Sequence, residues 1–350
     1  NDNGHAVLLY PKTIATIQTA LQQADGQRSR RLFVSGTNAT FELCPLEQGY
    51  VAYPKFNDTP LSARFFLKEG NESFAAGEHM LTFGPMRDRY IDQLCTHAFR
   101  PAGGFRGIPS GREAESLHAG ARAPGPEDGS RRFRLHRMEE MTETFPMEKI
   151  KIAQIGVCHE HASGKITALR RLPELFEIVG VVDDNATSTT PKFSGKNLQP
   201  YEGLKWMTEE EVLNYPGLQA VAVEVPNNEL VPTALRCMEH NLAMHMDKPA
   251  GEDLALYRKL LDGCRERNLP FQMGFMFRGN PAFQFCIAAI REKLIGEVFE
   301  IEADMNHNYG GDEYQEYIGK FRGGIMYNLG CHLIDFVVAA MGRPEQVTPF

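Results

Sequence analysis

Short apolar runs alternate with helically spaced segments through the middle of the chain. Runs typical of buried strands occupy residues 150–156, 176–184, 218–225, 242–246 and 270–277. Apolar residues recur at helical spacing over 165–172, 230–241 and 252–268. Strands that alternate with helices of this length predict βαβ units and a parallel sheet covered by helices. We therefore expect an α/β domain, a Rossmann-type doubly wound parallel sheet, over residues 147–277.

The two ends of the chain follow a different pattern. Residues 278–350 predict a helix over 282–294, a turn at Gly296, a strand over 297–308 and an apolar helix over 323–342. Residues 1–98 predict short strands over 5–10, 13–21, 31–36 and 39–47, read as an antiparallel meander, and then a helix over 87–99. Because these strands hold little core of their own, they need a partner sheet.

Residues 99–146 resemble neither part. Their Arg-, Gly-, Ala- and Pro-rich stretch from 100 to 137 has no helical or strand periodicity and too little apolar surface to offset chain entropy. A disordered linker is the interpretation we favour. An anion-binding arm and a stretch translated out of its original frame, as GC-rich codons would produce, stay open as alternatives.

Composition narrows the function classes. The chain has 350 residues and a formal net charge of −8, whereas nucleic-acid-binding proteins are more often basic. No signal peptide is readable in Asn1–Tyr10, and no apolar run approaches the ~18–20 residues that a membrane span needs. Its seven scattered cysteines contain no CxxC pair, so neither a disulfide framework nor a zinc finger is indicated. We expect a cytoplasmic protein that binds neither membrane nor nucleic acid.

The turn after the first strand of the parallel sheet is the first candidate for chemistry. It reads Gly156-Val157-Cys158-His159-Glu160-His161 and keeps one glycine of the G-x-G-x-x-G dinucleotide fingerprint. Its position matches that fingerprint, and Asp183 ends the second strand. An acid there accepts hydrogen bonds from ribose hydroxyls and repels a 2′-phosphate, which favours NAD over NADP. Cys158, His159 and His161 are also metal-ligand types, but no second cluster lies near them in sequence, so we expect side chains lining a cofactor pocket and no metal.

Two later segments carry further polar side chains. The segment His245–Gly251 brings Lys248 to the edge of the parallel sheet where ligands bind, and a lysine there can orient a hydroxyl or move a proton. Asn328 and His332 stand four residues apart in the predicted helix and so share a face, with Asp335 beyond them. Each feature alone has a structural explanation, a capped turn or a core histidine, but their combination favours a site.

These residues resemble the Gfo/Idh/MocA family of NAD(P)-dependent oxidoreductases, which includes glucose–fructose oxidoreductase and inositol dehydrogenase. The resemblance runs from Met147 to Phe350 through IKIAQIG, GVVD, VEVPNN, HMDKPAGED, MGFMFRGNPAF, IGEVFEIEAD and GGIMYNLGCHLIDF, in the family's order. Residues 1–98, through RRLFVSGTNATFELCPLE and RDRYIDQL, are similar to the family's C-terminal end. The chain thus reads as the end of one family member joined to the beginning of another, with Met147 as an original start.

The resemblance implies a function. A sugar, polyol or cyclitol hydroxyl would lose its proton to His332 while hydride moves to the nicotinamide, with Lys248 and Asn328 positioning the hydroxyl. Asn328 stands where the family has Asp. The implied cofactor-binding residues are Gly156, Val157, Cys158, His159, Asp183, Val225, Pro226, Asn227, Asp247, Lys248 and Pro249. A dinucleotide-binding relative without catalysis and an inactive fused product are the alternatives.

The resemblance also implies an architecture. The second domain is expected to be α+β with a mostly antiparallel open sheet, here split between the two ends of the chain. Strands of residues 6–45 would then pair with the strand over 297–308, or with a second copy of the chain. Because open sheets of this family commonly pair subunits, we also expect a homo-oligomer.

Overall fold

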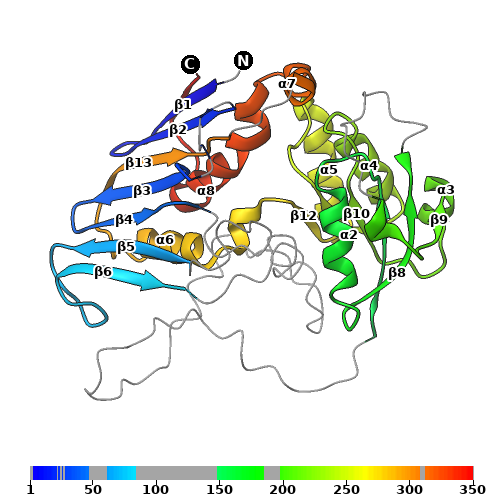
Figure 1. Cartoon of the computed structure of the whole chain (residues 1–350), viewed down its shortest axis with the longest axis horizontal. Coiled ribbons are helices and arrows are strands. Elements are labelled where there is room, and N and C mark those ends of the chain that lie inside the picture. The colour runs from blue at the N-terminus through cyan, green and yellow to red at the C-terminus, as the bar shows by residue number, and fades with distance from the viewer. Residues whose placement is uncertain are drawn as a thin grey trace.

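The computed structural model describes residues 3–46 except 22, 24, 25 and 27, and residues 61–83, 148–184, 198–307 and 312–349. The predicted helix over 87–99 and the predicted linker over 99–146 lie outside these residues. The described parts form two sheets with their helices (Figure 1). Among the described helices, none is both long and apolar enough to cross a bilayer.

The middle of the chain forms a six-stranded parallel sheet in the order β12-β11-β10-β7-β8-β9. The strands are β7 (Ile150–Ile155), β8 (Phe176–Val182), β9 (Trp206–Met207), β10 (Ala220–Val223), β11 (Ala243–Met246) and β12 (Phe271–Met273). The helices are α2 (Ala162–Arg170), α3 (Glu209–Leu213), α4 (Leu230–Glu239), α5 (Leu254–Glu266) and the 3₁₀ turn η5 (Gln199–Tyr201). Separate apolar clusters, one with α2 and one with α4 and α5, pack against the sheet, so the predicted doubly wound fold is confirmed.

The strand order also defines where a ligand would bind. From β7 the chain proceeds to β8 and β9 on one side, and β10 then returns to the other side of β7. The reversal lies between β7 and β10. In open α/β sheets ligands bind outside the carboxyl ends of the strands at such a reversal. The loops after β7 and β10 begin at Gly156 and Glu224.

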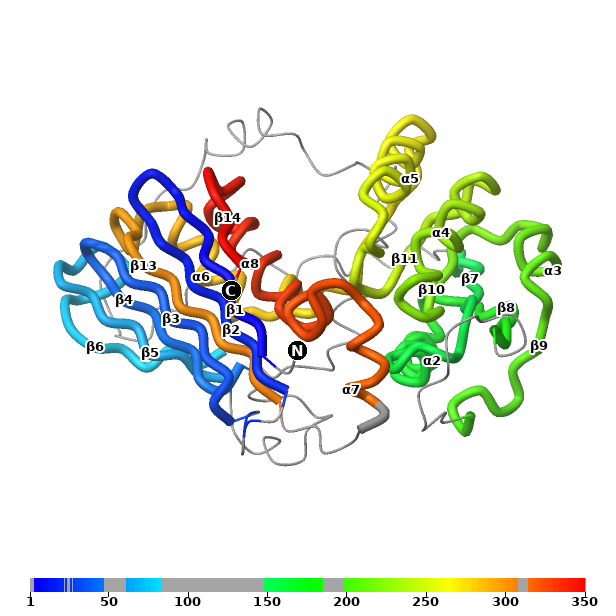
Figure 2. The backbone as a smooth tube through the Cα atoms, turned by 90° about the horizontal axis from the view of Figure 1, so that it is seen from above, coloured from blue at the N-terminus to red at the C-terminus, as the bar shows by residue number. Residues whose placement is uncertain are grey.

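Both ends of the chain build one eight-stranded sheet, in the order β14-β1-β2-β13-β3-β4-β5-β6 (Figure 2). The strands are β1 (Asn3–Leu9), β2 (Ile14–Ala20), β3 (Arg31–Gly36), β4 (Ala39–Leu43), β5 (Ser62–Leu67), β6 (Gly77–Thr82), β13 (Val298–Asp304) and β14 (Gln346–Pro349). β13 pairs parallel to β2 and antiparallel to β3, with Ile17 opposite Ala303 and Val34 opposite Ile301. The predicted pairing of residues 6–45 with 297–308 is confirmed.

The expectation of a continuous antiparallel meander in residues 5–47 is wrong. β13 separates β2 from β3, although the two strands are neighbours in sequence. Buried Thr13 ties the insertion down, since its hydroxyl donates to the carbonyl oxygen of Val298 at 2.6 Å. No side chain fits at Gly36, because a Cβ there would lie 2.5 Å from the Ile295 carbonyl oxygen. The inserted strand supplies the partner that the N-terminal strands lack.

One core joins the two ends of the chain. The helices α6 (Pro281–Arg291) and α8 (Cys331–Met341) lie together on one face of the eight-stranded sheet (Figures 1 and 2). Phe285 of α6 contacts Phe41 and Phe65, with ring centroids 6.0 and 5.6 Å apart. The opposite face carries ion pairs of Arg31 and Arg64 with Glu42. The fold is therefore α+β with one covered and one open sheet face.

Three elements differ from their predicted form. The strand expected over 270–277 covers only β12 and is followed by the 3₁₀ turn η6 (Met276–Gly279), and β13 ends at Asp304 rather than at residue 308. The helix expected over 323–342 begins as the π-helical turn η7 (Met326–Gly330) and becomes α-helical from Cys331. The helix α7 (Asp312–Gly319) precedes it.

Candidate active site

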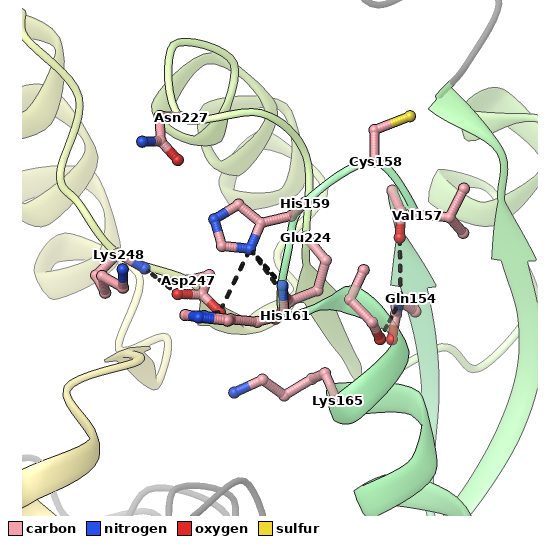
Figure 3. A network of polar contacts seen from close by, with 12 residues as sticks. Gln154, Val157, Cys158, His159, His161, Lys165, Glu224, Asn227, Asp247 and Lys248 are labelled. Carbon is pink, nitrogen blue, oxygen red and sulfur yellow. Dashed lines mark hydrogen bonds and ion pairs between the residues drawn. The ribbon is translucent and has the colours of Figure 1, made fainter. Parts of the chain in front are cut away.

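The loop after β7 is held close to the loop after β10. Gly156 has φ +102, and a Cβ there would lie 2.6 Å from the carbonyl carbon and oxygen of Glu224. The side-chain amide of buried Gln154, in β7, donates to the carbonyl oxygens of Gly156 and Ala162 at 2.9 and 3.2 Å (Figure 3). The single glycine of the fingerprint thus stands where backbone meets backbone and any side chain is excluded.

Asp184 and its neighbour Asp183 have different surroundings. Asp184 is buried, and its Oδ1 accepts the amides of Val157 and Cys158 at 2.9 and 3.1 Å. Asp183 is exposed at the carboxyl end of β8, where the sequence predicts a ribose-binding acid. Sequence reasoning missed the role of Asp184, although the Asp-Asp pair at the strand end offers two carboxylates for two tasks.

Buried imidazoles and carboxylates meet between the loops after β7, β10 and β11 (Figure 3). Nδ1 of His161 lies 3.0 Å from Oδ2 of Asp247, and Nδ1 of His159 lies 3.7 Å from both Asp247 Oδ2 and Glu224 Oε2. The side chains of Glu224, Asp247 and His159 are 0, 1 and 4% exposed, and that of His161 is 17% exposed. Asp247 also accepts the Lys248 amide at 2.6 Å and so fixes the start of that loop.

The charges in this cluster are set by burial and by one another. Burial and the charge of Asp247 raise the pKa of Glu224 well above its usual range. Burial acts in the same direction on Asp247, but the adjacent imidazoles of His161 and His159 outweigh it and hold the pKa of Asp247 well below its usual range. Burial lowers the pKa of His159 to about 3. Of the two carboxyl groups, Glu224 therefore holds a proton more tightly than Asp247.

A second buried pair lies beneath this cluster. Lys165 Nζ is 2.7 Å from Nε2 of His245, and neither residue is exposed to solvent. Burial, and then the ammonium of Lys165, lower the pKa of His245 to about 3. A neutral imidazole accepts from the lysine, while its Nδ1 lies 3.2 Å from Gln272 Oε1. The pair keeps a buried cation next to Asp247.

Lys248 connects the parallel-sheet unit with the segment that follows α7. Its side chain is buried, and Nζ donates to the backbone carbonyl of Asn328 in η7 at 2.9 Å. The Asn328 amide is engaged on both sides, since Oδ1 accepts from Asn227 at 3.1 Å and Nδ2 donates to the Tyr314 hydroxyl at 2.8 Å. Residues from the loops after β10 and β11, from α7 and from η7 thus converge on one place, and Lys248, Asn227 and Asn328 of the predicted site are among them.

His332 lies at the start of α8 rather than in one continuous α-helix with Asn328. The π-helical turn widens the backbone between them, so they do not have the regular i, i+4 spacing that the sequence predicts. The His332 ring is buried edge-on against Phe275 and Phe277, with centroids 6.0 and 5.8 Å away. Asp335 forms an ion pair with Arg278, at 2.6 and 2.8 Å, and this pair links α8 to η6.

The remaining predicted cofactor residues follow the same sheet edge. Val225, Pro226 and Asn227 are buried directly after β10, and Pro249 follows Lys248 through a cis peptide bond. Cys158 is half-buried in the β7 loop. Apart from Asp183 at the end of β8, the predicted cofactor residues gather around the reversal between β7 and β10.

The comparisons with known proteins follow this geometry. Residues 283–350 match the family model described as GFO/IDH/MocA C-terminal domain, which confirms the predicted resemblance to this family of oxidoreductases. The chain is 27% identical over 209 residues to an uncharacterized oxidoreductase of Schizosaccharomyces pombe, covering 58% of this chain and 54% of that protein. It is 24% identical over 204 residues to trans-1,2-dihydrobenzene-1,2-diol dehydrogenase of Xenopus tropicalis, covering 55 and 58%.

Among solved structures, the chain is similar to an NAD-binding protein from Listeria innocua, with a TM-score of 0.44, 22% identity and coverage of 55% of this chain and 54% of that one. A putative myo-inositol dehydrogenase from Sinorhizobium meliloti gives a TM-score of 0.42 at 18% identity, covering 55 and 56%. The chain spans about half the length of the curated relatives it matches.

Proposed function

We propose that the protein is an NAD-dependent oxidoreductase that transfers hydride between the hydroxyl-bearing carbon of a sugar, polyol or cyclitol and nicotinamide. The observation that carries this proposal is the position of Lys248. Its ammonium is buried at the carboxyl edge of the parallel sheet and reaches the Asn328 carbonyl, 80 residues further along the chain. A cation held at this edge beside a histidine-bearing helix suits the polarisation of a substrate hydroxyl.

The residues at the sheet edge fit a dinucleotide. Gly156 allows the closest approach of the two loops at the sheet reversal, and α2 begins without a side-chain cap, so its positive end is available for a pyrophosphate. The exposed Asp183 supports NAD rather than NADP, since a carboxylate repels a 2′-phosphate. The amides of Val157 and Cys158 donate to Asp184 and so hold the conformation of this loop.

The chain's own residues then divide the work. Bound NAD supplies the hydride acceptor. Lys248 orients the substrate hydroxyl and stabilises the charge that develops on its oxygen as the proton leaves. His332 takes that proton, and the rings of Phe275 and Phe277 around it exclude water. Asn328, with both ends of its amide engaged, positions the carbonyl that holds Lys248. The Xenopus tropicalis relative, named as a diol dehydrogenase, supports hydroxyl groups on a ring as the substrate class.

The test is an NADH and NADPH titration of the full chain, followed by turnover over a panel of sugars and cyclitols with NAD. We expect saturable binding that favours NADH and turnover of at least one polyol. No saturable binding by a chain that circular dichroism shows to be folded would overturn the proposal.

A dinucleotide-binding protein without catalysis is the second candidate. It is favoured by Asn328, which cannot hold a proton and whose amide is already engaged with Asn227 and Tyr314. NADH binding without turnover of any panel compound would support it, provided that Asn328→Asp does not create activity.

We also propose a cytoplasmic homo-oligomer that pairs through the open face of the eight-stranded sheet. This face exposes Phe66 of β5 and Met80 of β6, at 45 and 62%. Sedimentation equilibrium should give an oligomer for the wild type and a smaller species for Phe66→Lys. A monomeric wild type would contradict the proposal.

A further inference from the structure

The buried cluster beside Lys248 has the donor set of a metal site. Nδ1 of His159, Nδ1 of His161 and Oδ2 of Asp247 all lie within 4.8 Å of one another. Oδ2 of Asp247 lies 3.0 Å from Nδ1 of His161 and 3.7 Å from Nδ1 of His159. Ligands at ~2.0–2.1 Å in a tetrahedron stand about 3.3 Å apart. We propose that His159, His161 and Asp247 bind one divalent first-row transition-metal ion of the zinc type.

Glu224 supplies an independent observation for this site. It is fully buried, and its carboxyl group hydrogen-bonds the carboxyl group of Asp247. Its Oε2 is directed at the cluster, 3.7 Å from His159 Nδ1 (Figure 3). Two carboxyl groups buried side by side are costly, and a bound cation compensates them. Glu224 therefore borders the proposed site and favours a cation in it.

The donor types select the metal. Two imidazoles with carboxylates suit zinc, iron, cobalt or nickel, whereas magnesium and calcium prefer oxygen donors alone. The His161 backbone amide donates to His159 Nδ1 at 3.2 Å, so this nitrogen presents a lone pair rather than a proton. A bound cation would take this lone pair in place of the amide, next to the carboxyl groups of Asp247 and Glu224 that lie 3.7 Å away.

The site would have a structural consequence that does not depend on a cofactor. Its ligands come from the loops after β7 and β11, and Glu224 borders it from the loop after β10, the strand between them. A bound ion would tie these loops together and fix Asp247, whose Oδ1 receives the Lys248 amide. A metal here would thus position Lys248 through the backbone.

The experiment uses the full chain, stripped with a chelator, dialysed and free of dinucleotide. Titration with Co²⁺ should give visible d–d bands that saturate at one equivalent, and Zn²⁺ should displace them and raise Tm. His161→Asn and His159→Asn should each weaken Co²⁺ binding by at least about 100-fold. Glu224→Gln should weaken binding and shift the bands. His240→Asn, an exposed histidine after α4, is the matched control and should bind like the wild type.

Several outcomes would overturn the proposal. Co²⁺ spectra that remain those of the free aquo ion, with no Zn²⁺ retained after dialysis, would show that the cluster is an ion pair without metal. A near-ultraviolet thiolate band that Cys158→Ser abolishes would move the site to Cys158, Asp183 and Asp184, whose ligand atoms also lie within 4.8 Å of one another. Equal binding by wild type and a folded His161→Asn would refute the assigned ligands. Because the metal titration contains no dinucleotide, each of these outcomes keeps its meaning even if the protein does not bind NAD.

Discussion

The ammonium nitrogen of Lys248 lies 2.9 Å from the backbone carbonyl oxygen of Asn328, although the two residues belong to different structural units. Lys248 follows β11 of the parallel sheet, and Asn328 lies in the π-helical turn that leads into α8. This contact places a buried cation where two loops of the sheet edge meet a helix of the second unit. The first two predictions concern this region.

Replacing Lys248 by Met should lower turnover by about 10²–10⁴-fold, because the methionine cannot orient or polarise a hydroxyl. NADH affinity should change only a few-fold, since the loop after β7, which we propose binds the pyrophosphate, is elsewhere on the sheet edge. Steady-state kinetics and NADH fluorescence titration measure the two effects. Lys259→Met, on the exposed face of α5, is the control. Wild-type turnover in a folded Lys248→Met would remove Lys248 from the mechanism.

His332→Ala should lower turnover by a similar factor and change its pH dependence. With the proposed base removed, the acidic limb of the kcat/KM profile that belongs to His332 should disappear, and activity should rise toward high pH as hydroxide replaces it. A purely structural role would lower kcat/KM by the same factor at every pH. The measurement is kcat/KM between pH 5 and 9 for wild type and variant.

Gly156→Ala should destabilise the protein by more than about 3 kcal/mol, because φ is positive and the new Cβ would meet the Glu224 backbone at 2.6 Å. Gly203→Ala is the matched control. Gly203 also has a positive φ, +77, but no atom lies within 4 Å of its virtual Cβ, so only about 1 kcal/mol is lost. Urea unfolding of both variants separates steric contact from backbone strain. Equal losses would show that the Glu224 contact plays no part.

Asp184→Ala should cost about 1–3 kcal/mol and weaken NADH binding, because the amides of Val157 and Cys158 lose their shared acceptor. Asp184→Asn keeps one acceptor oxygen and should lose less. Asp262→Ala removes a carboxylate that forms an exposed ion pair with Arg265 on α5, and it should cost under about 1 kcal/mol. If Asp184→Ala unfolds like Asp262→Ala, the proposed support of the loop is wrong.

Stability should decrease at alkaline pH. Burial raises the pKa of the Cys286 thiol in α6 above its ordinary value of 9.0. Since this thiol ionises first in the unfolded state, its contribution to the free energy of unfolding is fully present below pH 9. That contribution is lost as the pH rises above this value. Each such thiol lowers the free energy of unfolding by about 1.4 kcal/mol per pH unit. Cys286→Ala should therefore give a shallower decrease than the wild type in urea unfolding between pH 8.5 and 10.5. If the free energy of unfolding falls equally steeply with pH in the wild type and in Cys286→Ala, ionisation of Cys286 is not the cause of the decrease.

Several elements could be read from local pattern alone. The strands of the parallel sheet, such as β10 and β11, are continuous apolar runs because both of their faces are buried, and helices such as α4 show a period of 3.6 residues because one face is buried. β6 escaped prediction because its exposed edge position leaves only alternate residues half-buried, as in Gly77–Thr82. β5 was also missed, although its alternation of buried and exposed residues is visible in the sequence of Ser62–Leu67. The π-helical turn at Met326–Gly330 has no signature in the sequence that distinguishes it from α-helix.

The candidate site could be predicted in part. Lys248 and Asn328 were identified by motif, and the structure brings them together. Asp184 was missed because two adjacent acids at a strand end differ only in which way each side chain points. Asp247 was placed with the cofactor residues, and its contact with His161, 86 residues away, depends on the order of strands in the sheet.

The sequence by itself determined five strands and three helices of the parallel sheet, the Rossmann-type fold of residues 147–277, and which turn carries the candidate loop. Hydrophobic periodicity is local, so it can be read without knowing any partner. Only the tertiary structure decided that β13 enters between β2 and β3, and that His159, His161, Glu224 and Asp247 meet in one buried cluster. Strand order arises from long-range burial, which sums contributions from both ends of the chain and leaves no mark within any single segment.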